Sequence, residues 1–210
     1  MKSGTTVTIV DCGMGNLQSV ANAFEAVGAL ACIARTPEEL SAAERIVLPG
    51  VGAFGHGMTK LREGGWVRKL EDEVRGKGKP FLGICLGMQL LASVGTEHGQ
   101  HEGLNWITGE VRRMVCVEPS LRLPHIGWND VRFVHSDGLY EGLGESQVFY
   151  FVHSYALNPD DGSVVSGVCN YGTEFAASIQ KDNLYATQFH PEKSHRAGLA
   201  VLKNFARLGG

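Results

Sequence analysis

The sequence has no run of about 18 or more apolar residues and no excess of charge of one sign. The first absence excludes a membrane-spanning helix, and we expect no membrane as a partner. The net charge is only −3 over 210 residues, which gives no electrostatic reason to expect nucleic acid as a partner. The apolar segment near the N-terminus is short and is interrupted by Asp11, which argues against a signal peptide.

The cysteines are few, odd in number and widely spaced. There are five, and no two of them form a C-x-x-C motif. This spacing argues against a disulfide framework and against a zinc site, so we expect neither a metal nor another cofactor. Free cysteines fit a reducing compartment, and we expect a cytoplasmic protein. Their positions are Cys12, Cys32, Cys85, Cys116 and Cys169.

The first half of the chain alternates strand-like and helix-like segments. Strands are predicted at Thr6–Val10, Leu30–Ala34, 46–49 and 80–84. Helices are predicted at 16–27, 37–43, 56–75 with a break at Gly64 and Gly65, and 86–93. This alternation predicts an α/β fold with parallel strands and helices on both faces of the sheet.

The second half has a different pattern, in which short strand-like runs are separated by turns. Strands are predicted at 108–117, 147–155, 163–170, 175–180 and 184–189, and a final helix at 194–208. Turns are expected at 136–138, 160–162 and Asn183. The chain contains no repeat or linker, so a single domain over residues 1–210 is the simplest interpretation.

Cys85 follows an apolar strand, precedes a predicted helix and is bracketed by Gly83 and Gly87. This arrangement is typical of a nucleophile elbow, in which the reactive residue occupies a strained turn at the top of a sheet. The helix that follows would favour the thiolate and could offer the Leu86 N–H to an oxyanion. On this segment alone, a Cys85 that merely fills the core is equally well supported.

A base for this thiol is offered by the segment 188-QFHPEKSH-195. His190 follows an apolar strand, where open α/β sheets carry their active-site residues. Pro191 disfavours helix at His190, and residues two apart in extended chain project to the same side. Glu192 is therefore expected to orient the imidazole. Alone, this segment also fits an exposed turn before a helix; combined with Cys85, it predicts a Cys-His-Glu triad.

The segment 46-IVLPGVGAFG-55 contains the G-x-G-x-x-G pattern of dinucleotide-binding loops. Three features argue against that function. The pattern follows the third strand, Pro49 interrupts the turn, and no acidic residue ends a following strand about 20 positions later. Backbone N–H groups of such a loop are equally suited to an oxyanion, and we expect the loop to serve Cys85.

Together, PGVGAFG, GICLGMQLL and HPEKS resemble the class I (triad) glutamine amidotransferases. With 11-DCGMGNLQSV-20, 124-PHIGWN-129 and 149-FYFVHSYA-156, the resemblance covers nearly the whole chain. It is greatest to the family of glutaminase subunits of imidazole glycerol phosphate synthase, which act in histidine biosynthesis. The resemblance implies a flavodoxin-like fold with a mostly parallel central sheet, flanking helices and additional antiparallel strands in the second half.

The resemblance also implies a reaction. Cys85 would attack the side-chain amide of L-glutamine, His190 would protonate the departing ammonia, and Glu192 would orient His190. Water would then hydrolyse the glutamyl thioester. The positions that match the family's oxyanion hole are Gly50, Val51, Gly52 and Leu86. The positions that match its glutamine site are Gln89, Glu97, His153, Ser154 and Tyr155.

The ammonia would pass to a cyclase partner with a (β/α)₈ barrel fold, which forms a heterodimer with the glutaminase and makes imidazole glycerol phosphate. Asn16 and Trp128 match positions at this heterodimer contact, and Lys193 can face the partner. Simpler interpretations exist for single residues. Asn16 would then be a helix cap, Gln89 a solvated helix position, Trp128 a core residue, His153 a hydrogen-bonded strand histidine and Lys193 a surface charge.

Several functions remain open at this stage. A very similar glutaminase would supply ammonia to a barrel-like synthase in surface-glycan sugar biosynthesis. A cysteine hydrolase or peptidase on the related fold would need no barrel partner, and a regulatory or nucleotide-binding module would rest on Gly50, Gly52 and Gly55. The sequence also departs from the family at Asn105, where glycine is usual, which affects only the loop around it.

Overall fold

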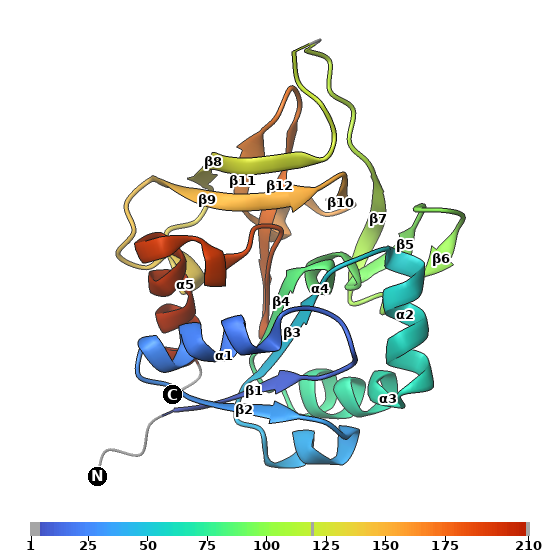
Figure 1. Cartoon of the computed structure of the whole chain (residues 1–210), viewed down its shortest axis with the longest axis vertical. Coiled ribbons are helices and arrows are strands. Elements are labelled where there is room, and N and C mark those ends of the chain that lie inside the picture. Colours follow the sequence, from blue (N-terminus) through green and yellow to red (C-terminus); the bar gives the residue numbers. More distant parts are fainter. Residues whose placement is uncertain (1–4, 119, 209–210) are drawn as a thin grey trace.

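The computed structural model describes residues 5–118 and 120–208. The strands of this part of the chain form two sheets (Figure 1). The larger sheet has nine strands in the order β2-β1-β3-β4-β13-β12-β11-β8-β9, and the smaller has four in the order β10-β7-β5-β6. None of the helices described is long and apolar enough to cross a membrane.

Half of the large sheet is parallel, as the alternating pattern of the first half predicts. Its strands are β1 Thr6–Val10, β2 Leu30–Ala34, β3 Ile46–Gly50, β4 Phe81–Cys85 and β13 Leu184–Thr187. All four neighbouring pairs among them run parallel. The predicted strands of the first half are therefore confirmed, each within one residue at either end.

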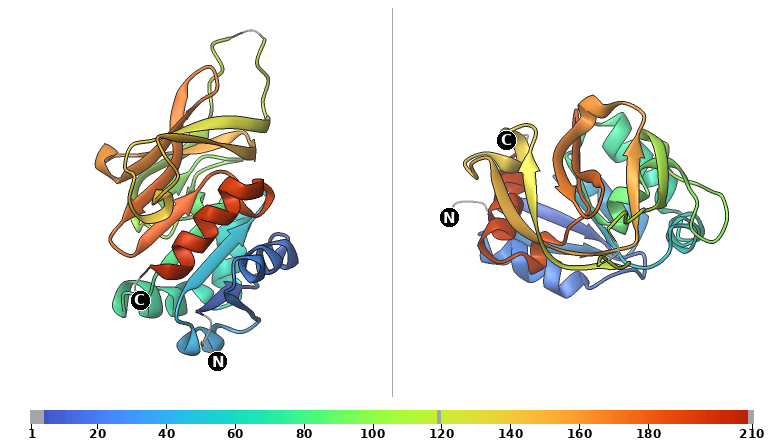
Figure 2. Two further views of the ribbon diagram at one scale, coloured as in Figure 1. Left: turned by 90° about the vertical axis from the view of Figure 1, so that its left-hand side faces the viewer. Right: turned by 90° about the horizontal axis from the view of Figure 1, so that it is seen from above.

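Helices cover both faces of this parallel region. One face packs against α1 Leu17–Ala26 and α5 His195–Arg207, and the other against α2 Phe54–Glu63 and α3 Trp66–Leu70 (Figures 1 and 2). Successive strand residues alternate between the two faces of the sheet. Val47 therefore packs in the core with α1 and α5, and Leu48 packs in the core with α2 and α3. Strands β1, β3, β4 and β13 are buried on both faces, which is why they read as nearly continuous apolar runs. The edge strand β2 is partly exposed.

The first three predicted helices differ from the structure only in detail. Asn16 caps α1, because its Oδ1 accepts a hydrogen bond from the Ser19 N–H at 3.1 Å. The segment predicted at 37–43 is a 3-10 helix, η1 Pro37–Ala42. The break at Gly64 and Gly65 is confirmed, and α3 continues into a π-helical turn, η2 Glu71–Gly76.

The predicted helix at 86–93 is wrong in its length. Helix α4, Leu86–Gln89, has only four residues, and the chain then enters strand β5, Ala92–Gly95. An apolar run of this kind is compatible with either element, so its pattern cannot locate the change. The partner strand decides it, because β5 pairs in parallel with β7, Ile107–Arg113.

The second half adds antiparallel strands to the large sheet and completes the small one. The added strands are β8 His125–Phe133, β9 Ser146–His153, β11 Val165–Asn170 and β12 Glu174–Lys181. The small sheet also contains β6 His101–Glu102 and β10 Tyr155–Pro159. Short 3-10 helices lie at Gly138–Tyr140, Gly162–Val164 and Pro191–Lys193.

The strand predicted at 147–155 is two strands in different sheets. β9 ends at His153 in the large sheet, and β10 begins at Tyr155 in the small one, so the chain changes sheets at Ser154. Strand β8 was not predicted, although exposed and less exposed residues alternate along it. Both differences come from strand partners distant in sequence, which local patterns do not reveal.

A buried carboxylate joins η2 to the start of β4. The Glu73 side chain is fully buried, and its oxygens lie 2.7–2.9 Å from the ammonium groups of Lys69, Lys77 and Lys79. Burial raises the pKa of Glu73, but the three lysines outweigh it and lower this pKa to about 2. Lys79 also donates to the carbonyls of Leu40 and Ser41, both at 3.0 Å, so the cluster ties η2 to η1.

We expect Glu73→Gln to lower the free energy of unfolding by about 1–3 kcal/mol at pH 7, because charged hydrogen bonds in a buried site are lost. The folded-state pKa of Glu73 lies below its ordinary value, so the stabilisation is complete above pH 4.5 and is lost toward about pH 2. Urea unfolding over this pH range measures the effect. The exposed Asp72→Asn is the control, expected within about 0.5 kcal/mol of wild type; equal losses for both variants would contradict the assignment.

Candidate active site

Cys85 ends strand β4 in a strained turn. Its φ of 54° and ψ of −106° lie in a region that side chains rarely adopt. The turn depends on two glycines: a Cβ on Gly83 would lie 2.6 Å from the Gly87 carbonyl oxygen, and a Cβ on Gly87 would overlap the Leu48 carbonyl. The predicted elbow is therefore present, and its glycines are needed for close backbone approach.

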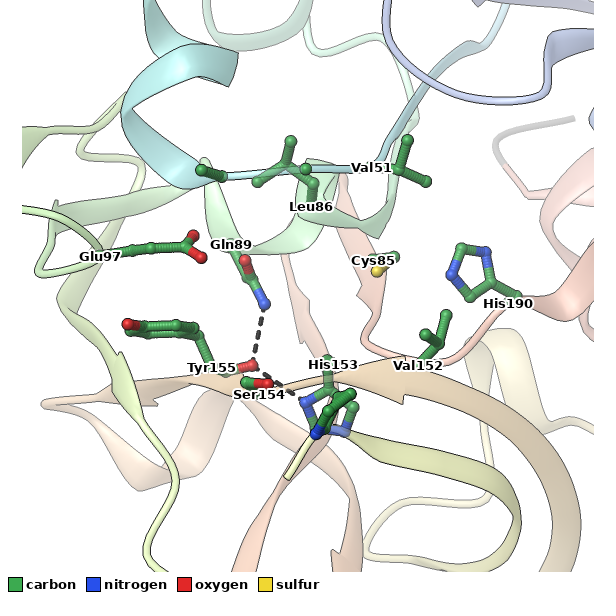
Figure 3. Close-up of a pocket in the computed structure, with 13 residues that line it drawn as sticks. Val51, Cys85, Leu86, Gln89, Glu97, Val152, His153, Ser154, Tyr155 and His190 are labelled. Atoms are coloured by element: carbon green, nitrogen blue, oxygen red, sulfur yellow. Dashed lines mark hydrogen bonds between the residues drawn. The ribbon is translucent and has the colours of Figure 1, made fainter. Parts of the chain in front are cut away.

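The structure brings His190 next to Cys85 although they lie 105 positions apart in sequence. The two side chains face each other at one end of the same pocket (Figure 3). The His190 Nδ1 lies 2.8 Å from Glu192 Oε1, and the Glu192 side chain is only 4% exposed. The Nε2 on the other side of the ring is buried without a hydrogen-bond partner among the described residues. This leaves Nε2 available to Cys85 or to a substrate.

The route by which Glu192 reaches the imidazole differs from the prediction. His190 is extended as expected, with φ −97° and ψ 96°. The next three residues, however, form the 3-10 helix Pro191–Lys193 and not a continued strand. The contact expected between residues 190 and 192 is thus made across a tight turn that Pro191 starts.

The charge distribution around His190 favours its protonated form. Burial lowers the pKa of His190, but the adjoining Cys85 sulfur and the Glu192 carboxylate outweigh it and raise this pKa to about 9. A protonated His190 ring places a positive charge beside the Cys85 sulfur.

A pocket of about 410 Å³ opens beside Cys85 and His190. Most of the residues predicted for the oxyanion hole and the glutamine site line it. They are Val51, Gly52, Leu86, Gln89, Glu97, His153, Ser154 and Tyr155. In Figure 3, Cys85 and His190 lie at one end, and Glu97 lies at the other, beyond Gln89.

The predicted oxyanion loop borders this pocket beside Cys85. Gly50 is the register partner of Cys85 in the parallel pair β3–β4 and lines a second, small cavity instead of the main pocket. Gly52 has a φ of 101°, a conformation that needs glycine. Helix α4 has only four residues, so its dipole contributes less at Leu86 than the predicted helix would have. Two residues of the glycine-rich loop, Val51 and Gly52, thus line the pocket beside Cys85.

Gln89 is buried and hydrogen-bonded, so its interpretation as a solvated helix position is wrong. Its Nε2 donates to the Tyr155 carbonyl at 2.9 Å and to Gln188 Oε1 at 3.0 Å (Figure 3 draws the bond to Tyr155). Gln188 in turn directs its Nε2 at Cys85 Sγ, at 3.7 Å. The sequence reasoning missed Gln188. The available signal was a polar residue in an apolar segment, two positions before His190.

Glu97 and His153 have structural partners of their own. Glu97 Oε2 accepts a hydrogen bond from the Phe54 N–H at 3.0 Å, at the N-terminus of α2. His153 is buried, and its Nδ1 lies 2.9 Å from the Tyr155 carbonyl. Burial lowers the pKa of His153 to about 4, so it is neutral at pH 7. The His153 side chain is therefore that of a buried, hydrogen-bonded strand histidine, as the simpler interpretation proposed.

The three residues predicted at the heterodimer contact lie outside the main pocket. Asn16 and Lys193 line the small cavity behind His190 and Glu192. Trp128 is 46% exposed and stacks on His195 with a centroid separation of 4.7 Å, so it is not a core residue. Asn16 is indeed the helix cap that the simpler interpretation proposes.

Trp128 belongs to an exposed apolar face of strands β8 and β9. Ile126 and Val148 are 60% and 43% exposed, and Trp128 pairs across the strands with Tyr150. Lys193 Nζ lies 6.0 Å from the centre of the Tyr150 ring. Val152, the cross-strand partner of Ile126, lines the Cys85 pocket, so this face begins at its rim.

Across residues 5–118 and 120–208, no group of three or more histidine, cysteine or acidic side chains is arranged to hold a metal.

Comparisons with known proteins agree with this geometry. Residues 8–208 match the family described as glutamine amidotransferase class-I. The chain is 47% identical to imidazole glycerol phosphate synthase subunit HisH of Geobacter sulfurreducens, over 97% of this chain and 99% of that protein. It is 48% identical to the protein of the same name from Methanothermobacter thermautotrophicus, over 96% and 98%.

Solved structures agree in fold. A structure of PurLQS from Thermotoga maritima has a TM-score of 0.71 at 18% identity, covering 96% of this chain and 97% of that one. The glutaminase domain of Trypanosoma brucei CTPS, with bound acivicin, has a TM-score of 0.64 at 18% identity, covering 96% and 94%. With the family match over residues 8–208 and relatives nearly half identical over their whole length, the chain belongs to the class I glutamine amidotransferases.

Proposed function

We propose that this protein is the glutaminase subunit of imidazole glycerol phosphate synthase. It hydrolyses L-glutamine through a thioester on Cys85 and passes the ammonia to a cyclase subunit in histidine biosynthesis. The observation that carries the chemistry is the facing pair of Cys85 and His190 at one end of a pocket. The histidine pathway, in preference to surface-glycan synthesis, is supported by full-length relatives at 46–48% identity that carry the name HisH.

In the first half of the reaction, Cys85 Sγ attacks the side-chain carbonyl carbon of glutamine. Electrons of the carbonyl bond move to its oxygen, and His190 Nε2 gives its proton to the amide nitrogen. The carbon–nitrogen bond then breaks, ammonia leaves, and a glutamyl thioester remains. The Glu192 carboxylate, 2.8 Å from Nδ1, holds the ring in the orientation that points Nε2 toward the reacting atoms.

The second half regenerates the thiolate. His190 Nε2, now without its proton, accepts one from an attacking water, and the carbon–sulfur bond breaks as glutamate forms. In both halves, negative charge develops on the carbonyl oxygen. Backbone N–H groups of Leu86 and of the Gly50-Val51-Gly52 loop, beside Cys85, are our candidates for its stabilisation.

The far end of the pocket fits the other end of glutamine. The Glu97 carboxylate offers the charge that complements an α-ammonium group, at the end opposite Cys85. Gln89 and the Ser154–Tyr155 segment form the wall between the two ends. Because residues of both sheets line this pocket, we also propose that the chain works as one glutaminase domain.

The exposed apolar face of β8 and β9 is our candidate docking surface for a (β/α)₈ cyclase. It contains Trp128 and reaches the rim of the pocket at Val152. A partner seated there would cover the region next to His190 from which ammonia leaves. This arrangement lets the heterodimer keep ammonia from solvent.

Cys85→Ala should reduce glutamine-driven synthesis by the reconstituted pair by at least about 10³-fold, because the nucleophile is lost. Synthesis from an added ammonium salt should persist, since it bypasses Cys85. Product formation with each nitrogen source measures both activities. Cys32→Ala, an exposed cysteine of β2, is the control and should leave both unchanged. Survival of glutamine-driven turnover in Cys85→Ala would remove the role of Cys85.

Glu192→Gln should lower the pKa of His190 from about 9, because the carboxylate that raises it is removed. Below this pKa the ring carries the proton that the departing nitrogen needs. As pH rises, the variant should therefore lose its activity at a lower pH than wild type does. Glutamine hydrolysis should also fall by about 100-fold. NMR titration of the His190 ring, with exposed Glu63→Gln as control, measures the shift. An identical midpoint in both variants would contradict the role of Glu192.

Trp128→Ala should weaken binding of the cyclase by about 30-fold, the scale of an aromatic hot spot. The matched control is Leu30→Ala in β2, which removes an exposed apolar side chain (57% exposed) at the opposite edge of the sheet. Titration calorimetry with the purified cyclase gives both affinities. Equal affinity for Trp128→Ala and wild type would exclude this face as the docking surface.

A further inference from the structure

Two buried histidines form a pair at the pocket wall, where His153 lines the pocket. His125 and His153 are direct cross-strand partners in β8 and β9, and each is at most 6% exposed. His125 Nδ1 lies 3.1 Å from His153 Nε2. The reaction described above uses neither imidazole, so the pair needs another explanation.

The hydrogen bonds of this pair have one consistent arrangement. A carbonyl oxygen only accepts, so His153 Nδ1 carries the hydrogen and donates to Tyr155 O at 2.9 Å. Neutral His153 then accepts at Nε2 from the N–H at His125 Nδ1, and His125 Nε2 accepts from Asn129 Nδ2 at 3.4 Å. Burial lowers the pKa of both histidines to about 4, which keeps them in the neutral form that this chain of bonds requires.

Aromatic packing holds His125 in place. Its ring stacks on Tyr171 at a centroid distance of 4.0 Å and on Phe151 at 4.8 Å. Asn129 Nδ2 is itself fixed, because it also donates to the Asn170 carbonyl at 2.9 Å. His125, which donates the hydrogen bond to His153, is therefore held rigidly in the large sheet.

The chain of bonds ends at the corner where the protein changes sheets. His153 is the last residue of β9, and Tyr155 is the first residue of β10 in the small sheet. The Tyr155 carbonyl accepts two hydrogen bonds, one from His153 Nδ1 and one from Gln89 Nε2, both at 2.9 Å. The Ser154 carbonyl accepts from the Met114 N–H at 2.9 Å. Ser154 and Tyr155 themselves line the pocket (Figure 3).

We propose that His125 and His153 are positioning residues, which fix the corner at Ser154 and hold the pocket wall and Gln89 in the geometry that binds glutamine. They act through Tyr155 and do not touch the reacting atoms. The inference rests on the proposed glutaminase function, and it adds His125, which otherwise has no role in the site.

Phenylalanine and asparagine at these positions separate shape from hydrogen bonding. His125→Phe keeps an aromatic ring between Tyr171 and Phe151 but removes the donor to His153. It should raise the KM for glutamine about tenfold, the scale of one lost buried hydrogen bond, with kcat within about twofold of wild type. Synthesis from ammonium salt by the reconstituted pair should be unchanged. The control is His135→Phe, an exposed histidine outside the pair, with KM as in wild type.

His153 provides the conservative rescue. In His153→Asn the side-chain amide retains a donor at the position of Nδ1, whereas His153→Phe has none. The asparagine variant keeps the bond to Tyr155 but loses the acceptor for His125, so its KM should rise about tenfold, as in His125→Phe. The phenylalanine variant loses both bonds, and its KM should rise about 100-fold. Equal KM values for His153→Asn and His153→Phe would overturn the proposal, as would an unchanged KM in His125→Phe.

Covalent labelling of Cys85 gives a second readout that does not need turnover. His125→Phe should react about tenfold more slowly with 6-diazo-5-oxo-L-norleucine, which has the shape of glutamine, but at the wild-type rate with small iodoacetamide. Equal slowing with both reagents would indicate a disturbed Cys85 and overturn the inference. Wild type that neither hydrolyses glutamine in the pair nor reacts with the glutamine analogue would instead refute the proposed function. Should His125→Phe not fold, the two His153 variants carry the test.

Discussion

The site depends on one close backbone approach, at the junction of β3, β4 and α4. Gly87 packs so tightly against the Leu48 carbonyl that no Cβ fits, and Gly83 has a similar restriction against Gly87. This approach turns the chain sharply enough to hold Cys85 at positive φ, with its sulfur in the pocket. It also sets Gly50 directly beside Cys85 in the parallel register, so the nucleophile and its candidate oxyanion loop share one constraint.

The two sheets divide the work of the pocket. The parallel half of the large sheet carries Cys85 at the end of β4 and His190 just beyond β13, as expected for the carboxyl ends of parallel strands. The wall opposite is the Ser154–Tyr155 corner, where the chain leaves one sheet for the other. Gln89 connects these parts, because it lies in α4, directly after Cys85, and its side chain donates a hydrogen bond to the Tyr155 carbonyl. The two sides of the pocket are thereby built from separate elements.

Two buried histidines of this pocket have opposite proton affinities, and their neighbours explain why. His190 bonds to a buried carboxylate and adjoins a sulfur, which together raise its pKa to about 9 despite burial. His153 has only a carbonyl and another neutral imidazole as partners, and burial lowers its pKa to about 4. One ring is thus suited to hold and release a proton near neutral pH, and the other to keep a fixed hydrogen-bond direction.

Local sequence was sufficient to predict the parallel strands of the first half and the elbow at Cys85, because these depend on apolar periodicity and glycine spacing. It also predicted that Glu192 contacts His190, although the contact is made across a 3-10 turn and not along an extended strand. Long-range contacts settle that α4 stops after four residues, that the run 147–155 splits between two sheets, and that Gln188 and His125 contact Cys85 and His153. The physical reason is the same in each case. Strand partners and hydrogen-bond acceptors that lie far away in the chain select among local conformations that the local sequence allows equally.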